Sequence, residues 1–289
     1  MLERLPVRGF WIRLTEPWQE LRRHQHYAPS VERLLGEAVS ASVLLAATLK
    51  FRGTLTLQLS GDGLVSLLVA QCTHDFAIRA VARAPEIVVG APGFRQLVGD
   101  GRLSVTVEAD ERAARYQGIV ALEGGTLAAS LESYFATSEQ LPTCIALAAD
   151  EDGTCGLLLQ HLPQAGVASG SAGALSAETW EELSARVAAL PADLLRLQSA
   201  EAVLQRVCAE HDCRLFEAAP VRFVCRCDTG RVRSVLLSLG AEELHSILDE
   251  QGAVSVTCEF CGRPYRFDAA DVEQLLAAGT GSADPASLN

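Results

Sequence analysis

Four cysteines near the C-terminus have the residue type and spacing of a metal site. Cys225 and Cys227 are spaced Cys-x-Cys, Cys258 and Cys261 are spaced Cys-x-x-Cys, and thirty residues separate the two pairs. Two close pairs of thiolates, brought together by an excursion of the chain, form a tetrahedral four-sulfur site, for which zinc is the default metal. Gly262 can adopt a positive φ directly after the last cysteine, which lets the backbone curl around the sulfurs. The spacing therefore predicts one zinc ion per chain, held by these four cysteines.

Three functions are compatible with such a site. It can serve only to fold a small module, it can act as a thiol redox switch because zinc-held sulfurs remain oxidisable thiolates, or it can belong to a nucleic-acid-binding zinc ribbon. The charge balance opposes the third function. The chain carries a net charge of −12, and residues 221–275 contain six arginines, no lysines and nine carboxylates. Phosphate binding needs clustered Lys and Arg, so we expect no nucleic-acid partner.

Length and composition indicate a protein with a sizeable core and more than one domain. The chain has 289 residues, of which 49% are hydrophobic, and this length predicts two domains. The start of the chain mixes charges with short apolar pieces and does not resemble a secretory signal, while the longest apolar run, near residues 43–49, is too short to span a bilayer. We expect a cytoplasmic protein with no membrane partner. In a reducing compartment, nine cysteines favour metal or redox roles over a disulfide framework.

Hydrophobic periodicity predicts an α+β amino-terminal domain with a mostly antiparallel sheet. Leu55, Leu57 and Leu59 alternate on one face of a strand, and a Gly-Asp-Gly turn then leads into a second strand, which is typical of a hairpin. The predicted helices cover residues 31–49 and 126–136, and the predicted strands cover residues 54–60, 65–70, 103–108, 116–122, 144–149 and 155–160.

A change of composition marks the end of this domain. Residues 164–176 are rich in Gly, Ala and Ser, which is typical of a boundary. We predict an amino-terminal domain over residues 1–170, a metastable helical linker over 171–218, a zinc-binding redox-switch domain over 219–278 and a disordered tail over 279–289.

The predicted linker has one apolar stripe. Trp180, Leu183, Val187 and Leu190 recur at helical spacing, Thr179 with Glu182 could form a capping box, and Pro191 breaks a pattern that resumes over residues 194–207. Short helices are marginal in water on their own. We therefore expect the stripe to pack on the amino-terminal domain or on the cysteine module, although an ordinary helical connection is the alternative.

In the cysteine module, local patterns predict a short strand at 221–225, helices at 231–239 and 241–248, a strand at 254–257 and a last helix at 269–277. Gly252 would close the second helix, and Asp268 would be the N-cap of the last one.

Several motifs, taken in order, resemble the 33-kilodalton heat-shock protein family, the redox-regulated chaperones. In the cysteine module the likeness rests on Phe223-Val-Cys-Arg-Cys227, Leu239-Gly240-Ala-Glu-Glu-Leu244, Cys258-Glu-Phe-Cys261-Gly262 and Tyr265-x-Phe267. Earlier in the chain it rests on Leu35-Gly36-Glu37, Thr48-Leu49-Lys50, Leu57-Gln58-Leu59-Ser60-Gly61-Asp62-Gly63, Tyr116-x-Gly118-Ile119-Val120, Tyr134-Phe135-x-x-Ser138-Glu139-Gln140 and Leu158-Leu159-Gln160-His161-Leu162-Pro163. The likeness extends over nearly the whole chain.

The resemblance implies a holdase chaperone, not an enzyme. It implies that the reduced, zinc-bound form is inactive, and that an oxidant converts the ligands into Cys225–Cys227 and Cys258–Cys261 disulfides. The freed linker stripe would then bind unfolding client proteins and prevent their aggregation, and the active form would be a homodimer. Two other functions stay open: a thiol-disulfide oxidoreductase that uses Cys258 and Cys261, and a constitutive scaffold stapled by zinc.

Two features depart from the family pattern. Asp228-Thr229-Gly230 follows the first cysteine pair, where the family tends to have a serine and a basic stretch. Cys208 and Cys213 flank His211 in the linker. Three roles are open for them: they are inert, they ligate metal by exchange, or they oxidise. Free cysteines mostly behave as small hydrophobes, which favours the inert interpretation.

Overall fold

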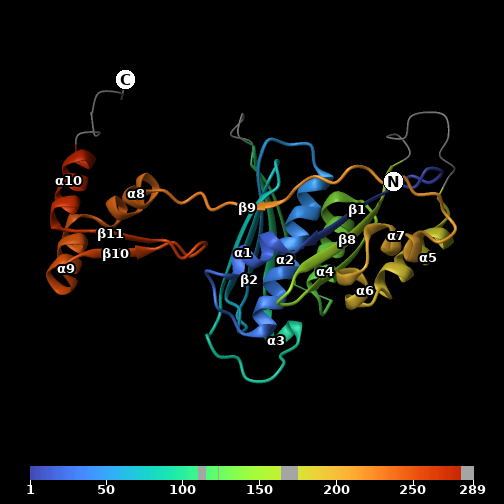
Figure 1. The fold of residues 1–289 in the computed structure, drawn as a ribbon, viewed down its shortest axis with the longest axis horizontal. Helices are drawn as coiled ribbons and strands as arrows, with labels where there is room; N and C mark the ends of the chain where they lie inside the picture. The colour runs from blue at the N-terminus through green and yellow to red at the C-terminus, as the bar shows by residue number, and fades with distance from the viewer. Residues whose placement is uncertain (110–114, 123, 164–174, 281–289) are drawn as a thin grey trace. The chain divides into compact units, whose positions relative to one another are not determined.

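Two sheets with a long helix between them form the larger of two units (Figure 1). The computed structural model describes residues 1–109, 115–122, 124–163 and 175–280. It divides into a unit spanning Met1–Val224 and a unit spanning Cys225–Asn289. The described residues confirm the predicted α+β class.

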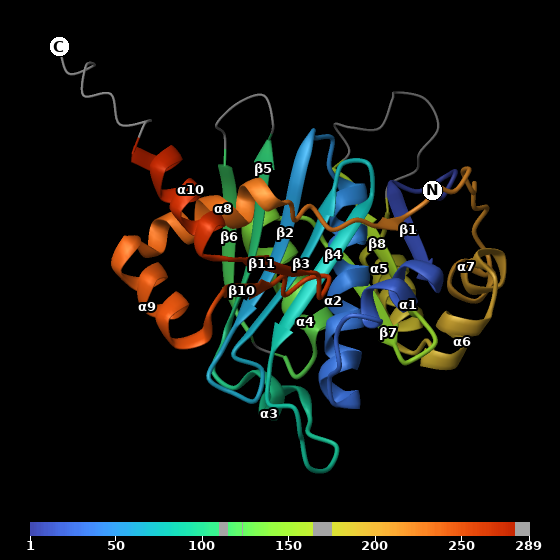
Figure 2. The same cartoon turned by 60° about the vertical axis from the view of Figure 1, so that its left-hand side comes forward.

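The strands of the first unit form a six-stranded and a three-stranded sheet (Figure 2). The described strand pairs of this unit are antiparallel apart from β4 with β9. The six-stranded sheet has the order β6-β5-β2-β3-β4-β9, with β2 Gly53–Ser60, β3 Leu67–Thr73, β4 Ala77–Arg83, β5 Arg102–Ala109, β6 Arg115–Ala121 and β9 Arg222–Phe223. The three-stranded sheet has the order β1-β8-β7, with β1 Val7–Leu14, β7 Thr143–Ala149 and β8 Thr154–His161.

Helix α2 (Pro29–Thr48) lies between the two sheets and contacts both of them. It is buried on nearly all sides, which explains why its sequence is apolar around the whole helix. Gly36 permits a close approach, because a Cβ atom at this position would lie 2.6 Å from the Cβ of Ala149 on β7. The shorter helices of this region are α1 (Glu16–Arg22), α3 (Phe94–Val98) and α4 (Leu127–Tyr134), and a π-helix (Phe135–Glu139) continues α4.

The predicted helices and strands of this domain are confirmed, with boundary shifts of a few residues, but β1, β4, α1, α3 and the π-helix were not predicted. β1 and β4 each carry two arginines among their apolar residues, so neither strand shows a clean alternation of apolar and polar residues. The predicted strand at 221–225 shrinks to the two residues of β9, which joins the edge of the six-stranded sheet.

Three short helices form a layer over the outer face of the three-stranded sheet: α5 (Ala177–Ala188), α6 (Ala192–Leu197) and α7 (Ala200–Cys208). The predicted capping box at Thr179 is wrong, because Ser176 is the N-cap of α5 and accepts from the Thr179 N–H. The resumed pattern at 194–207 is two helices, since Ser199 caps a new one. The boundary segment at 164–174 and the tail at 281–289 lie outside the described residues.

The second unit is a small module of three helices and one hairpin. The hairpin pairs β10 (Val254–Thr257) with β11 (Pro264–Phe267), and the helices are α8 (Thr229–Leu239), α9 (Ala241–Gln251) and α10 (Ala269–Thr280). Gly252 ends α9 in a left-handed conformation and Asp268 accepts from the Asp271 N–H at the start of α10, as predicted. Its core consists of six buried side chains: Leu236, Leu244, Val254, Phe267, Val272 and Leu275. So small a core needs a covalent or metal staple.

Candidate metal centre

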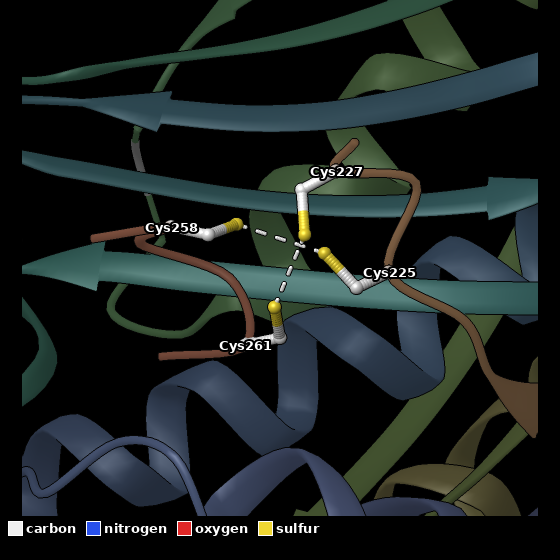
Figure 3. A group of neighbouring side chains, drawn as sticks. All are labelled: Cys225, Cys227, Cys258 and Cys261. Atoms are coloured by element: carbon white, nitrogen blue, oxygen red, sulfur yellow. Dashed lines mark hydrogen bonds between the residues drawn. The ribbon is translucent and has the colours of Figure 1, made fainter. Parts of the chain in front are cut away.

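The four predicted cysteines converge at one end of the module (Figure 3). Their sulfurs all lie within 4.8 Å of one another. The Sγ atoms of Cys225 and Cys258 are 3.6 Å apart, and those of Cys227 and Cys261 are 3.4 Å apart. Four sulfurs placed tetrahedrally about 2.3 Å from a zinc ion would be separated by about 3.8 Å. The group is therefore close enough to hold a metal ion, and its donor set and spacing fit zinc.

Each pair of cysteines is positioned by a local backbone feature. Cys258 and Cys261 lie in the turn between β10 and β11, where the Gly262 N–H donates to the Cys258 carbonyl at 2.8 Å and the Cys258 N–H donates to the Arg263 carbonyl at 3.0 Å. Gly262 has a φ of +65°, as expected for a glycine that closes such a turn. Because β10 and β11 are paired right up to this turn, the two thiols are held at the tip of the hairpin.

The first pair precedes helix α8. The carboxylate of Asp228, one residue after Cys227, accepts from the Arg231 N–H at 2.9 Å and caps this helix. An N-cap aspartate stabilises a helix start by about 1 kcal/mol. The Asp228-Thr229-Gly230 departure from the family pattern therefore has a structural role next to the site, because it fixes where α8 begins.

The cysteine thiols ionise with different ease in the absence of metal. Burial raises the pKa of Cys225 above its usual range, and burial also raises the pKa of Cys261. Burial opposes ionisation of Cys227 too, but the nearby Tyr265 hydroxyl and the other cysteine thiols outweigh it and lower the pKa of Cys227 to about 7. A metal binds thiolate, so Cys227 is already prepared for ligation near neutral pH.

Tyr265 was not predicted as a site residue, although it belongs to a motif that resembles the family. It lies on β11, four residues after Cys261, and its hydroxyl interacts with Cys227. The signal in the sequence is its position, because the strand that follows a Cys-x-x-Cys turn folds back past the sulfurs. Arg263 lies in the same turn, and Coulombic attraction to Cys227 and Cys261 contributes to raising its pKa, after the hydrogen bond with Tyr265.

The predicted linker stripe lies elsewhere, within the first unit. Leu183 and Val187 of α5 are each 1% exposed, and Trp180 and Leu190 are partly buried beside them. Their partners are side chains of β7 and β8, which include Cys144, Leu157 and Leu159. The sequence left two packing partners open for the stripe, the amino-terminal domain and the cysteine module. In the structure the stripe packs on a sheet of the amino-terminal domain. The stripe is therefore an interface and not a free surface.

The remaining cysteines are distributed through the first unit. Cys72 is fully buried in the six-stranded sheet, and burial raises its pKa to about 12. Cys144, Cys155, Cys208 and Cys213 all contribute to the apolar cluster beneath the linker helices. Among the described residues, Cys225, Cys227, Cys258 and Cys261 form the group of metal-binding side chains that lies close enough to share one ion.

Comparison with known proteins gives matches along nearly the entire chain. The family model described as Hsp33 protein matches residues 1–268. A 33 kDa chaperonin of Nitrosococcus oceani is 40% identical over 278 residues, covering 96% of this chain and 92% of the relative. A 33 kDa chaperonin of Pseudomonas paraeruginosa is 41% identical over 283 residues, covering 97% and 94%. The crystal structure of the Thermotoga maritima 33 kDa chaperonin superposes with a TM-score of 0.82 at 26% identity, covering 96% of both chains.

None of the described helices combines the length and apolarity that a membrane span requires.

Proposed function

This chain belongs to the Hsp33 family and is a chaperone, and on this premise we propose that it is a holdase whose four cysteines bind one zinc ion and act as its redox switch. The convergence of the four sulfurs on one ion-sized centre carries the proposal. In the reduced state, Cys225, Cys227, Cys258 and Cys261 would be the ligands. Bound zinc would hold these sulfurs as thiolates and staple the hairpin to the start of α8.

Oxidation of the cysteines would remove the staple. Metal binding contributes about 10 kcal/mol or more to the folding of small zinc modules, and the six-residue core of this module is too small to replace that contribution. Once the sulfurs have formed disulfides they can no longer ligate metal, so we expect the module to unfold.

The pairing Cys225–Cys227 and Cys258–Cys261 is part of the proposal. In the folded module the two shortest sulfur contacts join one motif to the other. In an unfolded module, the two or three residues between motif partners favour contact within a motif over contact across a thirty-residue loop, because the entropy of loop closure grows with loop length. Non-reducing tryptic mapping separates the two outcomes. A cross-motif disulfide joins residues 223–226 or 227–231 to residues 234–266, whereas disulfides within motifs leave residues 234–266 separate, because trypsin does not cleave between Arg263 and Pro264.

Client binding would follow from undocking of the linker helices. Leu183, Val187 and their partners on β7 and β8 are apolar and are covered only while α5 stays in place. Exposed and adaptable apolar surface is what binds unfolded proteins. The proposed clients are unfolding proteins during oxidative stress, the proposed setting is the cytoplasm, and a homodimer is the proposed form of the active protein.

The deciding experiment measures zinc content and suppression of client aggregation in the same samples. A thermally unfolding client enzyme is followed by light scattering with protein that is reduced, treated with peroxide under mild heat, or treated with hypochlorous acid. We expect release of one zinc per chain together with a gain of suppression, and reversal on incubation with a dithiol and zinc. Equal suppression by the reduced and oxidised protein would instead support the scaffold.

An oxidoreductase is the competing activity, and the placement of Cys258 and Cys261 opposes it. Both lie in a hairpin turn between β10 and β11, and not at the start of a helix after a strand as in thioredoxin-like sites. Reduction of insulin disulfides tests this activity directly, and we expect no rate above that of the dithiol alone.

A further inference from the structure

A second pair of cysteines lies at the end of the linker helices, and Cys213 precedes the first cysteine of the four-cysteine group by twelve positions. Cys208 is the last residue of α7 and is 1% exposed, while Cys213 is half-buried and packs against the same apolar cluster. The two cysteines are five positions apart in the sequence and belong to one cluster of packed side chains. We propose that Cys208 and Cys213 are a redox-active pair, which peroxide or hypochlorous acid converts into a Cys208–Cys213 disulfide that clasps α7 to the amino-terminal residues.

The backbone holds this pair in a tight turn. The His211 N–H donates to the Cys208 carbonyl at 2.7 Å, and the Cys213 thiol donates to the His211 carbonyl at 3.5 Å. The chain after the turn is fixed from the other side, because Cys213 forms an antiparallel bridge with the buried Leu2. The turn and the bridge therefore hold the backbone on both sides of the pair, and a disulfide forms between cysteines whose Cα atoms lie within about 7 Å of each other.

Hydrogen bonds flank this bridge on both sides. The Glu3 N–H donates to the Asp212 carbonyl at 3.0 Å, and the Arg214 N–H donates to the Met1 carbonyl at 2.9 Å. Residues 212–214 thus run beside residues 1–3 as a short antiparallel pair.

Burial opposes ionisation of Cys208, and two nearby cations act against that effect. The pKa of Cys208 is raised to about 12 by burial and by its interaction with Cys213, whereas the amino group of Met1 and the guanidinium of Arg186 act in the opposite direction. Arg186 also donates to the Val207 carbonyl at 3.3 Å, which holds this cation next to Cys208. Cys213 is the more exposed of the two, so it is the thiol that an oxidant reaches first.

The reaction needs only the oxidant of the proposed switch. The Cys213 thiolate attacks one oxygen of hydrogen peroxide and the O–O bond breaks, which gives a sulfenic acid and a hydroxide that takes up the proton lost by Cys213 and becomes water. The Cys208 sulfur then attacks the sulfenic sulfur, an S–S bond forms and the S–O bond breaks. The sulfenic OH leaves with the Cys208 proton as a second water. The second step is intramolecular, because both sulfurs belong to one turn of the chain, and this raises its rate.

The disulfide would restrict which part of the linker leaves the sheet. Cys213 remains bridged to Leu2, so a bond to Cys208 keeps the last turn of α7 beside the amino-terminal residues. Helices α5 and α6 carry no such bond. We therefore expect the oxidised protein to retain order at the end of α7.

Tryptic mapping of the full-length protein tests the disulfide. Arginines at 206 and 214 bound a tryptic peptide, residues 207–214, that contains both cysteines of the pair and no other cysteine. After oxidation, alkylation and digestion without reductant, we expect this peptide to be two hydrogen atoms lighter than its reduced form and to take up no alkylating agent. In Cys213→Ser, Cys208 should be alkylated instead. Two results would overturn the proposal. One is a wild-type peptide with both thiols alkylated when the four-cysteine group is fully oxidised, and the other is a disulfide from Cys208 to a cysteine other than Cys213.

Hydrogen exchange tests the clasp and separates it from the disulfide alone. In the oxidised wild type, amides near the end of α7 should exchange several-fold more slowly than in oxidised Cys213→Ser, while the reduced forms of the two proteins should match. Equal exchange in the oxidised pair would overturn the clasp. Neither measurement depends on client binding, so failure here is distinguishable from failure of the proposed chaperone switch.

Discussion

Cys258 and Cys72 provide a matched pair for testing the metal site at the level of single atoms. Cys258 lies in the four-sulfur group, and Cys72 is buried in the six-stranded sheet. We expect Cys258→Ser to weaken zinc binding by at least tenfold, because a neutral hydroxyl replaces a thiolate ligand, and Cys72→Ser to retain one zinc per chain. Competition with a chromogenic chelator measures both affinities. Unchanged zinc affinity in Cys258→Ser would show that the ligand assignment is wrong.

The buried thiol of Cys72 also makes stability depend on pH. Its folded pKa of about 12 lies above the ordinary cysteine value of about 8.5. The stability that the protonated Cys72 thiol contributes is therefore fully present below the pKa of this thiol in the unfolded state. It is lost as pH rises toward the pKa of the thiol in the folded state. Between pH 8 and pH 10 the reduced protein should lose about 1–2 kcal/mol through this thiol.

The Cys72→Ser variant isolates the contribution of this thiol to the loss of stability, because a serine hydroxyl does not ionise between pH 8 and pH 10. Denaturant unfolding of the first unit at the two pH values should give a smaller loss in the variant than in the parent. An identical loss in both proteins would contradict a buried, neutral thiol at this position.

At the scale of elements, the linker helices are held by few side chains, and two leucines allow the docking to be tested. Leu183 on α5 is 1% exposed, whereas Leu197 at the end of α6 is 69% exposed. Removing a buried leucine costs about 2–5 kcal/mol. We expect Leu183→Ala to release α5 and to give client binding without oxidation, and Leu197→Ala to behave as the wild type. Val187→Asp, which buries a charge in the same interface, should act like Leu183→Ala.

Two measurements on the reduced variants check this expectation. Hydrogen exchange should become faster over residues 177–208 in Leu183→Ala while β2, β3 and β5 stay protected, and light scattering should show suppressed aggregation of a client. Faster exchange without suppression would mean that exposure of the linker is not what activates the protein.

For the whole molecule, the division into two units predicts that metal removal acts unevenly. The second unit has a six-residue core, whereas the first has an extensive core around α2 and a second apolar cluster beneath α5–α7. A chelator added to the reduced protein should therefore abolish hydrogen-exchange protection of β10, β11 and α8–α10, while the two sheets of the first unit remain protected. Added zinc should restore the module, and retained protection of β10 and β11 after complete zinc removal would contradict the metal staple.

Much of the site is determined by local sequence. The spacing of the cysteines, the glycine after Cys261 and the cap at Asp268 depend on backbone geometry within a few residues, and each is found as predicted. The same holds for α2, whose apolar residues recur at helical spacing. It also holds for β2, whose alternation indicates which face of the strand is buried. Strands such as β1 and β4 escaped prediction because arginines interrupt their apolar residues and their burial depends on neighbours far away in the chain.

Other features were decided only by the tertiary structure. The linker stripe was readable from the sequence, but its partner was not, because α5 packs on β7 and β8 through contacts with no local signature. Likewise, the sequence did not show the surroundings of Cys208 and Cys213, because the bridge between Leu2 and Cys213 brings them beside the amino terminus, more than 200 residues earlier in the chain. Periodicity and spacing encode what a segment can bury or bind, whereas its partner is chosen by the packing of the whole chain.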